Sequence, residues 1–308
     1  MTDDRFSYPH RRRGLDHDWF AHEPTIRRQP IMWPGRCHIA LWITVPVELF
    51  PLNATELPVR PLGTLDRGYP DYWTFSNRDY GLRIGIFRIM RVLDGFGLRA
   101  TAAVNAAAAV NYPRVMNELL QREWEMMASG IDMGQPHHSR LSVDDERQLI
   151  RTAHDVLTTI TRNNITGWHS PGHSQSAQTL QLLAERNFDY VADWVNDDLP
   201  YMMTTSAGQL VAMPLTYEWS DRVLLVHHNL SVEDYELQVL HALHRLHAEA
   251  GQFGGRILSL SVSPWVLGYP HRICALERVL ARIMEAGSVW PATGAQIVAA
   301  FKSQASAL

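Results

Sequence analysis

The sequence predicts an α/β fold in which a mostly parallel sheet closes, or nearly closes, into a barrel. Segments typical of strands alternate with segments typical of helices about seven times along the 308 residues. The strand-like segments are mostly short apolar runs, which suit strands buried on both faces of a parallel sheet. No sequence repeat or low-complexity linker divides the chain. We therefore predict one barrel domain over residues 33–308, preceded by a polar N-terminal arm over residues 1–32.

The first half of the chain supplies three strands and three helices. The run from His38 to Val45 is continuously apolar, as expected of a buried strand. Gly95 and Gly97 end the first predicted helix, and Ser142 begins a capping box that opens a longer one. In order, we expect a strand at 38–45, a helix at 83–96, a strand at 100–104, a helix at 114–123, a strand at 124–128 and a helix at 142–161.

The second half continues the alternation with shorter elements. Ser231 is a further helix cap, and the segment 256–263 alternates apolar and polar residues as a strand does. In order, we expect a strand at 166–169, a helix at 177–186, strands at 190–193, 210–213 and 224–228, a helix from Ser231 to about Gly251, a strand at 256–263, a helix at 273–285 and a strand at 289–292.

Composition and charge exclude several functional classes. The chain has 28 Lys and Arg against 32 Asp and Glu, a net charge of −4, so no strong basic field attracts nucleic acid or an anionic membrane. The longest apolar runs are far shorter than the ~20 residues that cross a bilayer. The two cysteines, Cys37 and Cys274, are too few for a Cys-based zinc site.

The same features predict the setting of the protein. No apolar stretch follows Arg11–Arg13, so we expect no secretory signal and a cytoplasmic location. We expect a small-molecule substrate as the partner, and neither nucleic acid nor a membrane. The N-terminal arm and the near-neutral charge are compatible with a homo-oligomer.

Polar side chains follow several predicted strands, where the active sites of such barrels lie. Imidazoles and carboxylates transfer protons near neutral pH or ligate divalent metals. We assign Glu48, His169, His173 and Asp193 as candidate catalytic residues, and His137 and His138 as candidate metal ligands.

Each of these groups has a plainer alternative. His137 and His138 lack the HxxH spacing of a metal motif and are compatible with a surface or packing pair. Asp193 lies among the carboxylates of residues 193–198, where either a raised pKa or a solvated turn is expected. Ser174 lies in a segment similar to a nucleophile elbow that lacks its last glycine, and a chance match is the alternative.

Several short motifs also recur along the chain in a characteristic order. They are Trp33-Pro34-Gly35, Arg78-Asp79-Tyr80-Gly81 with Arg83 and Arg88, Trp124-Glu125, Gly167-Trp168 with Pro171, Tyr190–Trp194 with Asp197–Pro200, and Pro264-Trp265 with Gly268 and Arg272. Together they resemble the polysaccharide deacetylase (NodB-homology, carbohydrate esterase 4) superfamily, in particular its intracellular allantoinase-like branch. The resemblance covers residues 33–301 and implies a distorted (β/α)7 barrel that hydrolyses a C–N amide bond.

The resemblance further implies a mechanism whose usual residues are partly substituted. In the metal-dependent members an Asp and two His hold a divalent metal such as zinc, a second Asp is the base and a late His is the acid. A metal-free site is the alternative. Val45 and Pro46 stand at the positions of the Asp pair, and Ser129 stands at that of the first metal-binding His. The Arg position is His169 or Ser170, and the late His position is Ser263.

The strand-end loops and the resemblance also give candidate substrate-binding residues. Tryptophans in these loops can line a closed aromatic pocket of the kind that small ligands use, with core packing as the alternative. We assign to this role Arg78, Trp168, Trp194, Glu218, Asp221 and Trp265.

Three functions remain compatible with the sequence. The first, which we favour, is a hydrolase of a non-peptide C–N bond in a small amide, ureide or imide, open or cyclic, with a rebuilt His and carboxylate site. The second is a catalytically inactive barrel that binds a small ligand or a partner protein, which Ser129 and Ser263 favour. The third is a serine-type hydrolase acting through Ser170 or Ser174.

Overall fold

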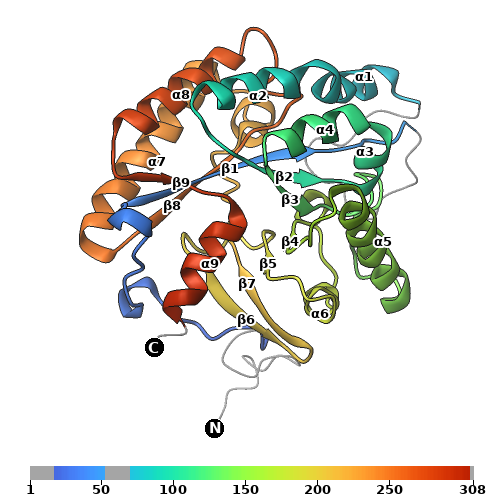
Figure 1. Ribbon diagram of the computed structural model, residues 1–308, viewed down its shortest axis with the longest axis horizontal. Helices are drawn as coiled ribbons and strands as arrows, with labels where there is room; N and C mark the ends of the chain where they lie inside the picture. Colours follow the sequence, from blue (N-terminus) through green and yellow to red (C-terminus); the bar gives the residue numbers. More distant parts are fainter. Residues whose placement is uncertain (1–16, 53–69, 306–308) are drawn as a thin grey trace.

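A curled, mostly parallel sheet forms the centre of the fold, with helices packed around it (Figure 1). The computed structural model describes residues 17–52 and 70–305, so residues 1–16 of the predicted N-terminal arm lie outside the described residues. Within these ranges the sheet has nine strands in the order β6-β7-β5-β4-β3-β2-β1-β8, with β9 also paired to β1. The strands are β1 (Ile39–Val47), β2 (Thr101–Val104), β3 (Glu125–Ala128), β4 (Gly167–Trp168), β5 (Tyr190–Val191), β6 (Tyr201–Thr205), β7 (Gly208–Ala212), β8 (Arg256–Ser261) and β9 (Val289–Pro291).

β1 pairs with three other strands, and all nine of its residues are buried. It pairs with β8 from Ile39 to Thr44, with β9 over its first residues and with β2 from Thr44 to Val47. Because helices or barrel interior cover both faces, the strand reads as one continuous apolar run. The predicted strand at 38–45 is confirmed and extends to Val47.

The barrel is closed by side chains where its backbone ladder is open. β7 and β8 do not pair in the described part of the chain. The segment after β7 spans the gap instead: Ser259 on β8 accepts the Thr216 N–H through its hydroxyl at 2.9 Å and the Trp219 indole N–H through its carbonyl at 2.9 Å. The predicted fold, a distorted parallel barrel, is confirmed.

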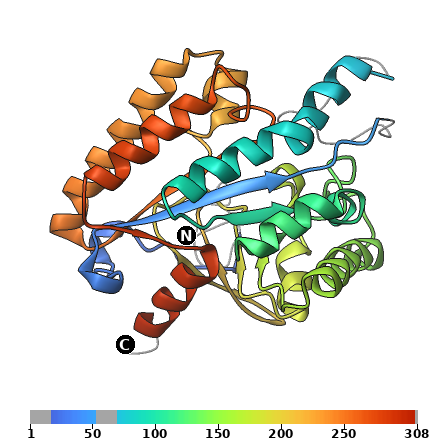
Figure 2. The same cartoon turned by 45° about the horizontal axis from the view of Figure 1, so that its top comes forward.

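The helices cover the outside of the sheet. Figure 2 shows α7 and α8, in orange and red, side by side, and α7 packs against β8. α9 lies at the end where β2 and β3 begin, since its Gly294 and Ala295 N–H groups bind Thr101 and Glu125. No described helix is both long and apolar enough to cross a bilayer. The helices are α1 (Tyr72–Tyr80), α2 (Ile86–Gly95), α3 (Ala106–Asn111), α4 (Pro113–Gln121), α5 (Val143–Thr161), α6 (Thr179–Glu185), α7 (Val232–Phe253), α8 (Ile273–Glu285) and α9 (Gly294–Ala305).

One predicted strand is wrong and one strand was not expected. The segment predicted as a strand at 224–228 lies in a π-helical turn, Arg222–His227 (η6). A short apolar run is compatible with either structure when nothing around it fixes the period. β6 carries too weak a pattern to predict, because it is an edge strand and only its Met203 is buried.

The helix expected at 83–96 is the end of a longer helical segment that begins at Tyr72. In this segment α1, a π-helical turn at Gly81–Gly85 (η4) and α2 follow one another directly. The glycines of this turn allow a very close contact with the loop after β8. A Cβ atom on Gly85 would overlap the carbonyl oxygen of Pro264, and one on Gly81 would lie 2.9 Å from the Trp265 nitrogen. This contact fixes Trp265 beside the carboxyl ends of the strands.

Replacing Gly85 by Ala tests this packing. We expect Gly85→Ala to lower the free energy of unfolding by about 1–3 kcal/mol, because the added methyl group overlaps backbone atoms that cannot move freely. The matched control is Gly95→Ala at the end of α2, the helix that follows this turn, where a Cβ meets nothing within 4 Å. It should leave stability unchanged or raise it by up to about 1 kcal/mol. Urea unfolding measures both, and equal stabilities of the two variants would contradict the close contact.

Candidate active site

Side chains from three parallel strands meet at the carboxyl edge of the sheet. Glu48 directly follows β1, His169 directly follows β4, and Asp193 comes two residues after β5. Since parallel strands end at the same edge, their following residues gather there. Glu48 and His169 border a cavity of about 60 Å³, whose lining also includes His173, Thr216, Tyr217 and Arg222.

His169 and His173 face each other at this cavity. Their Nε2 atoms are 3.5 Å apart and their rings are nearly perpendicular, at 84°. His173 ends a short 3-10 turn, Pro171–His173 (η5), and has a left-handed backbone φ of 58°, which is uncommon for a residue with a side chain. The other ring nitrogen of His169 lies 3.4 Å from the Ser129 hydroxyl. The turn after β4 therefore brings two imidazoles into contact.

Asp193 is held rigidly beside this pair. Its carboxylate accepts hydrogen bonds at 2.7 Å each from the Ser170 N–H, the Ser170 hydroxyl and the Gln175 side-chain amide. Burial raises the pKa of Asp193, while the nearby His173 and these hydrogen bonds limit the rise. The predicted catalytic residues His169, His173 and Asp193 thus lie together.

Burial keeps both imidazoles in their neutral form. The pKa of His169 lies well below its usual range because the ring is buried and because His173 and Arg222 are close. Burial likewise lowers the pKa of His173, although the Asp193 carboxylate opposes the shift. A neutral imidazole can accept a proton or ligate a metal, and a protonated one can do neither.

Arg222 brings a permanent cation into the cavity. Its guanidinium forms an ion pair with Glu48 and donates through Nε to the Ser263 hydroxyl at 2.8 Å. The two side chains are only 13% and 5% exposed. Burial opposes the charge of Arg222, but the nearby carboxylates of Glu48 and Asp221 together outweigh burial and raise the pKa of the guanidinium. Glu48, predicted as catalytic, is therefore the partner of a buried cation.

Asp221 fixes Ser263, the residue at the position where the resemblance implies a late histidine. Its two carboxylate oxygens accept the Ser263 N–H at 2.6 Å and the Ser263 hydroxyl at 2.9 Å. Asp221 is fully buried, and burial raises its pKa to about 7 against the opposing effect of Arg222. The predicted role of Asp221 was substrate binding, whereas its contacts here are with the loop after β8.

The predicted metal ligands lie apart from this site. Among the His, Cys, Asp and Glu residues described, the group that could share a metal ion is His169, His173 and Asp193. His137 is buried, and its Nδ1 atom is 2.9 Å from a Glu146 carboxylate oxygen. His138 accepts the N–H of Arg140 at 3.2 Å.

The predicted substrate-binding tryptophans take different positions. Trp168 is fully buried and donates its indole N–H to Ser170 at 2.8 Å. Trp194 donates to Gln175 at 3.1 Å, which in turn binds Asp193. Trp265 lies between two cations. The guanidinium carbon of Arg78 is 3.6 Å from the centroid of the Trp265 ring, and that of Arg222 is 5.3 Å from it.

Glu218, predicted to bind substrate, is exposed and does not line the cavity. The two serines of the serine-type alternative also lie outside the lining. The Ser170 hydroxyl donates to Asp193 and the Ser174 hydroxyl donates to the Pro171 carbonyl. Neither serine hydroxyl has a hydrogen bond to an imidazole within the described ranges, so the serine-type alternative lacks its base.

Arg222 is a charged residue of the cavity that the sequence did not single out. It follows Asp221 in a short polar segment that carries no motif or spacing, so no signal separates it from a surface arginine. Only the fold, which brings the segment after β7 across to β1, places it at the cavity.

The donor set of the site fits a divalent metal. The two imidazoles are neutral, and one ligand atom from each of His169, His173 and Asp193 lies within 4.8 Å of the others. Two nitrogen ligands of a tetrahedral zinc ion lie roughly 3.3–3.5 Å apart, and the two Nε2 atoms are 3.5 Å apart. A proton shared between the imidazoles is the other state that suits this contact.

Comparison with known proteins supports the fold. No protein-family model and no curated protein sequence matches the chain. Among solved structures, a probable polysaccharide deacetylase from Pseudomonas aeruginosa PAO1 matches with a TM-score of 0.78, at 23% identity, over 87% of this chain and 92% of that one. Puue allantoinase matches with a TM-score of 0.82, at 22% identity, over 96% and 98% of the two chains.

A more distant match comes from a protein whose activity was altered. A mutant of a Bacillus anthracis CE4-family pseudoenzyme, described as having restored enzymatic activity, has a TM-score of 0.51 at 10% identity over 84% of this chain and 67% of that one. The fold is therefore that of the polysaccharide deacetylase and allantoinase barrels, as the sequence motifs predict.

A double-mutant cycle tests the Glu48–Arg222 ion pair. Either Glu48→Gln or Arg222→Met leaves one buried charge without its partner, so each should lower the free energy of unfolding by about 3–5 kcal/mol. The double variant removes both charges and should be less destabilised than the sum by about 1–3 kcal/mol. Strictly additive losses in urea unfolding would show that the two charges do not interact.

The raised pKa of Asp221 predicts a pH effect on stability. Between the unfolded pKa, about 4, and the folded pKa, about 7, only the unfolded state releases the proton, so rising pH favours unfolding. Relative to Asp221→Asn, the wild type should lose roughly 1.4 kcal/mol of unfolding free energy per pH unit in this interval. Urea unfolding from pH 4.5 to 7 measures the difference, and a difference that does not change with pH would refute the shift.

Proposed function

We propose that the chain hydrolyses a non-peptide C–N bond in a small amide, cyclic imide or ureide, at the cavity between His169, His173 and Arg222. One observation carries the proposal: two neutral imidazoles and one buried cation line the same cavity. Hydrolysis of an amide needs a base for the attacking water and positive charge for the carbonyl oxygen.

The residues divide these tasks in a simple way. His173 accepts a proton from water, and the Asp193 carboxylate beside it stabilises the imidazolium that results. The water oxygen attacks the carbonyl carbon, and negative charge develops on the carbonyl oxygen. The C–N bond then breaks, and the proton returns from the imidazole pair to the leaving nitrogen.

Arg222 is suited to stabilise the developing negative charge. Its bonds to Glu48 and Ser263 use two of its five guanidinium N–H groups, so it keeps donors for a substrate oxygen. Ser263 has no titratable group near pH 7 and acts here by orienting Arg222. A cation that cannot lose its proton supplies charge at every working pH.

A divalent metal is the second way in which the same residues could work. His169, His173 and Asp193 would hold it, and it would polarise the carbonyl and lower the pKa of water. The size of the cavity supports a small reacting group in either case, because about 60 Å³ cannot enclose a glycan.

The alternative proposal is an inactive barrel that binds a small ligand. Ser129 and Ser263 stand where the resemblance implies histidines, and the fold is shared with a protein described as a pseudoenzyme. A binding barrel would lose stability or ligand affinity when the imidazoles are removed, and it would show no turnover to lose.

Turnover of a matched set of amides distinguishes the two. With hydantoin, succinimide and N-acetylglucosamine, we expect hydrolysis of a cyclic substrate and a loss of about 10²–10⁴-fold in kcat for His173→Ala. The matched control is His241→Ala, an exposed residue of α7, which should keep full activity. Assay with and without a chelator shows whether the metal is needed. Absence of turnover with every substrate, with and without added zinc, would refute the proposed function.

A further inference from the structure

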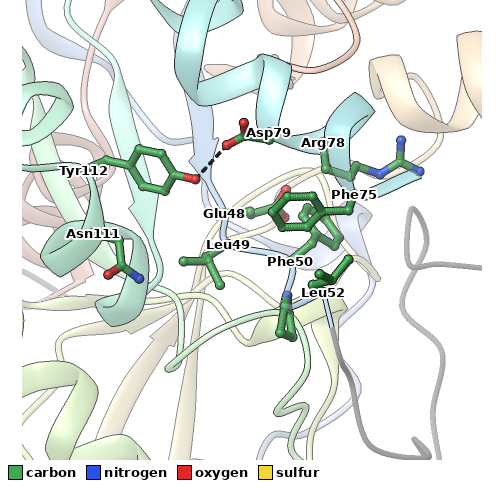
Figure 3. A pocket seen from close by; sticks show the side chains of 10 residues that line it. Glu48, Leu49, Phe50, Leu52, Phe75, Arg78, Asp79, Asn111 and Tyr112 are labelled. Carbon is green, nitrogen blue, oxygen red and sulfur yellow. Dashed lines mark hydrogen bonds between the residues drawn. The ribbon is translucent and has the colours of Figure 1, made fainter. Parts of the chain in front are cut away.

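A second and larger cavity adjoins the proposed active site. It encloses about 320 Å³ and shares Glu48 with the smaller cavity. Figure 3 shows its lining: Glu48 and Phe75 lie at the centre with Phe50, Leu52 lies on one side, and Tyr112 and Asn111 on the other. These side chains come from the segment after β1, from α1, and from the end of α3 with Tyr112, the residue that follows it. The mechanism proposed above does not use this space.

The part of the lining nearest Glu48 is apolar. Leu49, Phe50, Leu52 and Phe75 present hydrocarbon, and Phe50 packs edge-on against Trp265, with 6.5 Å between ring centroids. A hydroxyl-rich group placed here would lose water without gaining donors or acceptors in return, which is costly. An aryl or branched alkyl group would gain from leaving water.

The polar groups of the lining are largely bound to one another. The Tyr112 hydroxyl donates to an Asp79 carboxylate oxygen at 2.7 Å, and Glu48 is paired with Arg222. The guanidinium of Arg78 lies 3.6 Å from the centroid of the Trp265 ring and 5.8 Å from that of the Phe50 ring. The lining carries two carboxylates, Glu48 and Asp79, against the one guanidinium of Arg78, so its net charge does not favour an anionic group.

We propose that this outer cavity binds an uncharged apolar substituent, aryl or branched alkyl, of the molecule whose reacting group enters the inner cavity. The identity of the reacting group rests on the proposed function, whereas the preference for an apolar substituent rests on the lining alone. The substrate class is therefore an apolar-substituted cyclic amide or ureide, and not a glycan or a simple acetamide.

Binding of two matched hydantoins tests the preference. 5-Benzylhydantoin and 5-(hydroxymethyl)hydantoin share the reacting ring and differ in the substituent. By isothermal titration calorimetry on the full chain, we expect the benzyl compound to bind about 10- to 100-fold more tightly. Phe75→Ser should reduce this preference to about threefold or less.

A matched control uses the same helix. Tyr72→Ser changes an aromatic residue of α1 that is 65% exposed and outside the lining, so it should keep the preference. Leu52→Ser provides a second cavity variant in case Phe75→Ser does not fold, as thermal denaturation would show. Its preference should also fall.

The possible outcomes separate this inference from the proposed function. Equal affinities for the two hydantoins, a preference that survives both cavity variants, or no binding of either compound at millimolar concentration would overturn the inference. A benzyl preference that the cavity variants remove would support it even if no compound were hydrolysed, and the proposed function alone would then fail. Hydrolysis without any preference would leave the proposed function standing and refute the inference.

Discussion

The buried ion pair between Glu48 and Arg222 is the interaction on which the candidate active site depends. It links the end of β1 to the π-helical turn after β7, across the part of the barrel where β7 and β8 form no backbone ladder in the described chain. A charge removed from water needs such a partner. Burial is the main cause that lowers the pKa of both His169 and His173, and the guanidinium adds to it at both rings, while Glu48 opposes it at His173. The contact therefore places a permanent cation beside two imidazoles that burial keeps neutral.

The helices whose caps or apolar spacing fix their bounds could be predicted from the sequence. The capping serine at Ser142 begins α5, and its hydroxyl accepts the Asp145 N–H as a capping box requires. The helix at 273–285 matches α8 residue for residue, because its apolar stripe is regular. The strand predicted at 224–228 is wrong because its three apolar residues are too few to fix a period.

The candidate site was predictable only in part, for a physical reason. His169, His173 and Asp193 follow predicted strands, and parallel strands bring such residues to one edge. The adjacent pair at 137–138 looked similar in sequence, but Glu146 holds His137 away from that group. Arg222 came from a segment whose structure and position depend on barrel closure, which no local pattern encodes. The two residues that replace the implied histidines, Ser129 and Ser263, are both hydrogen-bonding neighbours of the new site.

The most direct test of the account is a crystal structure of the His173→Ala variant with hydantoin bound. This variant lacks the proposed base and retains the guanidinium. The account predicts a carbonyl oxygen of the ring within hydrogen-bonding distance of the Arg222 guanidinium, roughly 2.7–3.2 Å, with the carbonyl carbon facing the imidazole of His169. A ring bound with its carbonyl groups turned away from Arg222, or bound only outside the cavity at saturating concentration, would contradict the central claim.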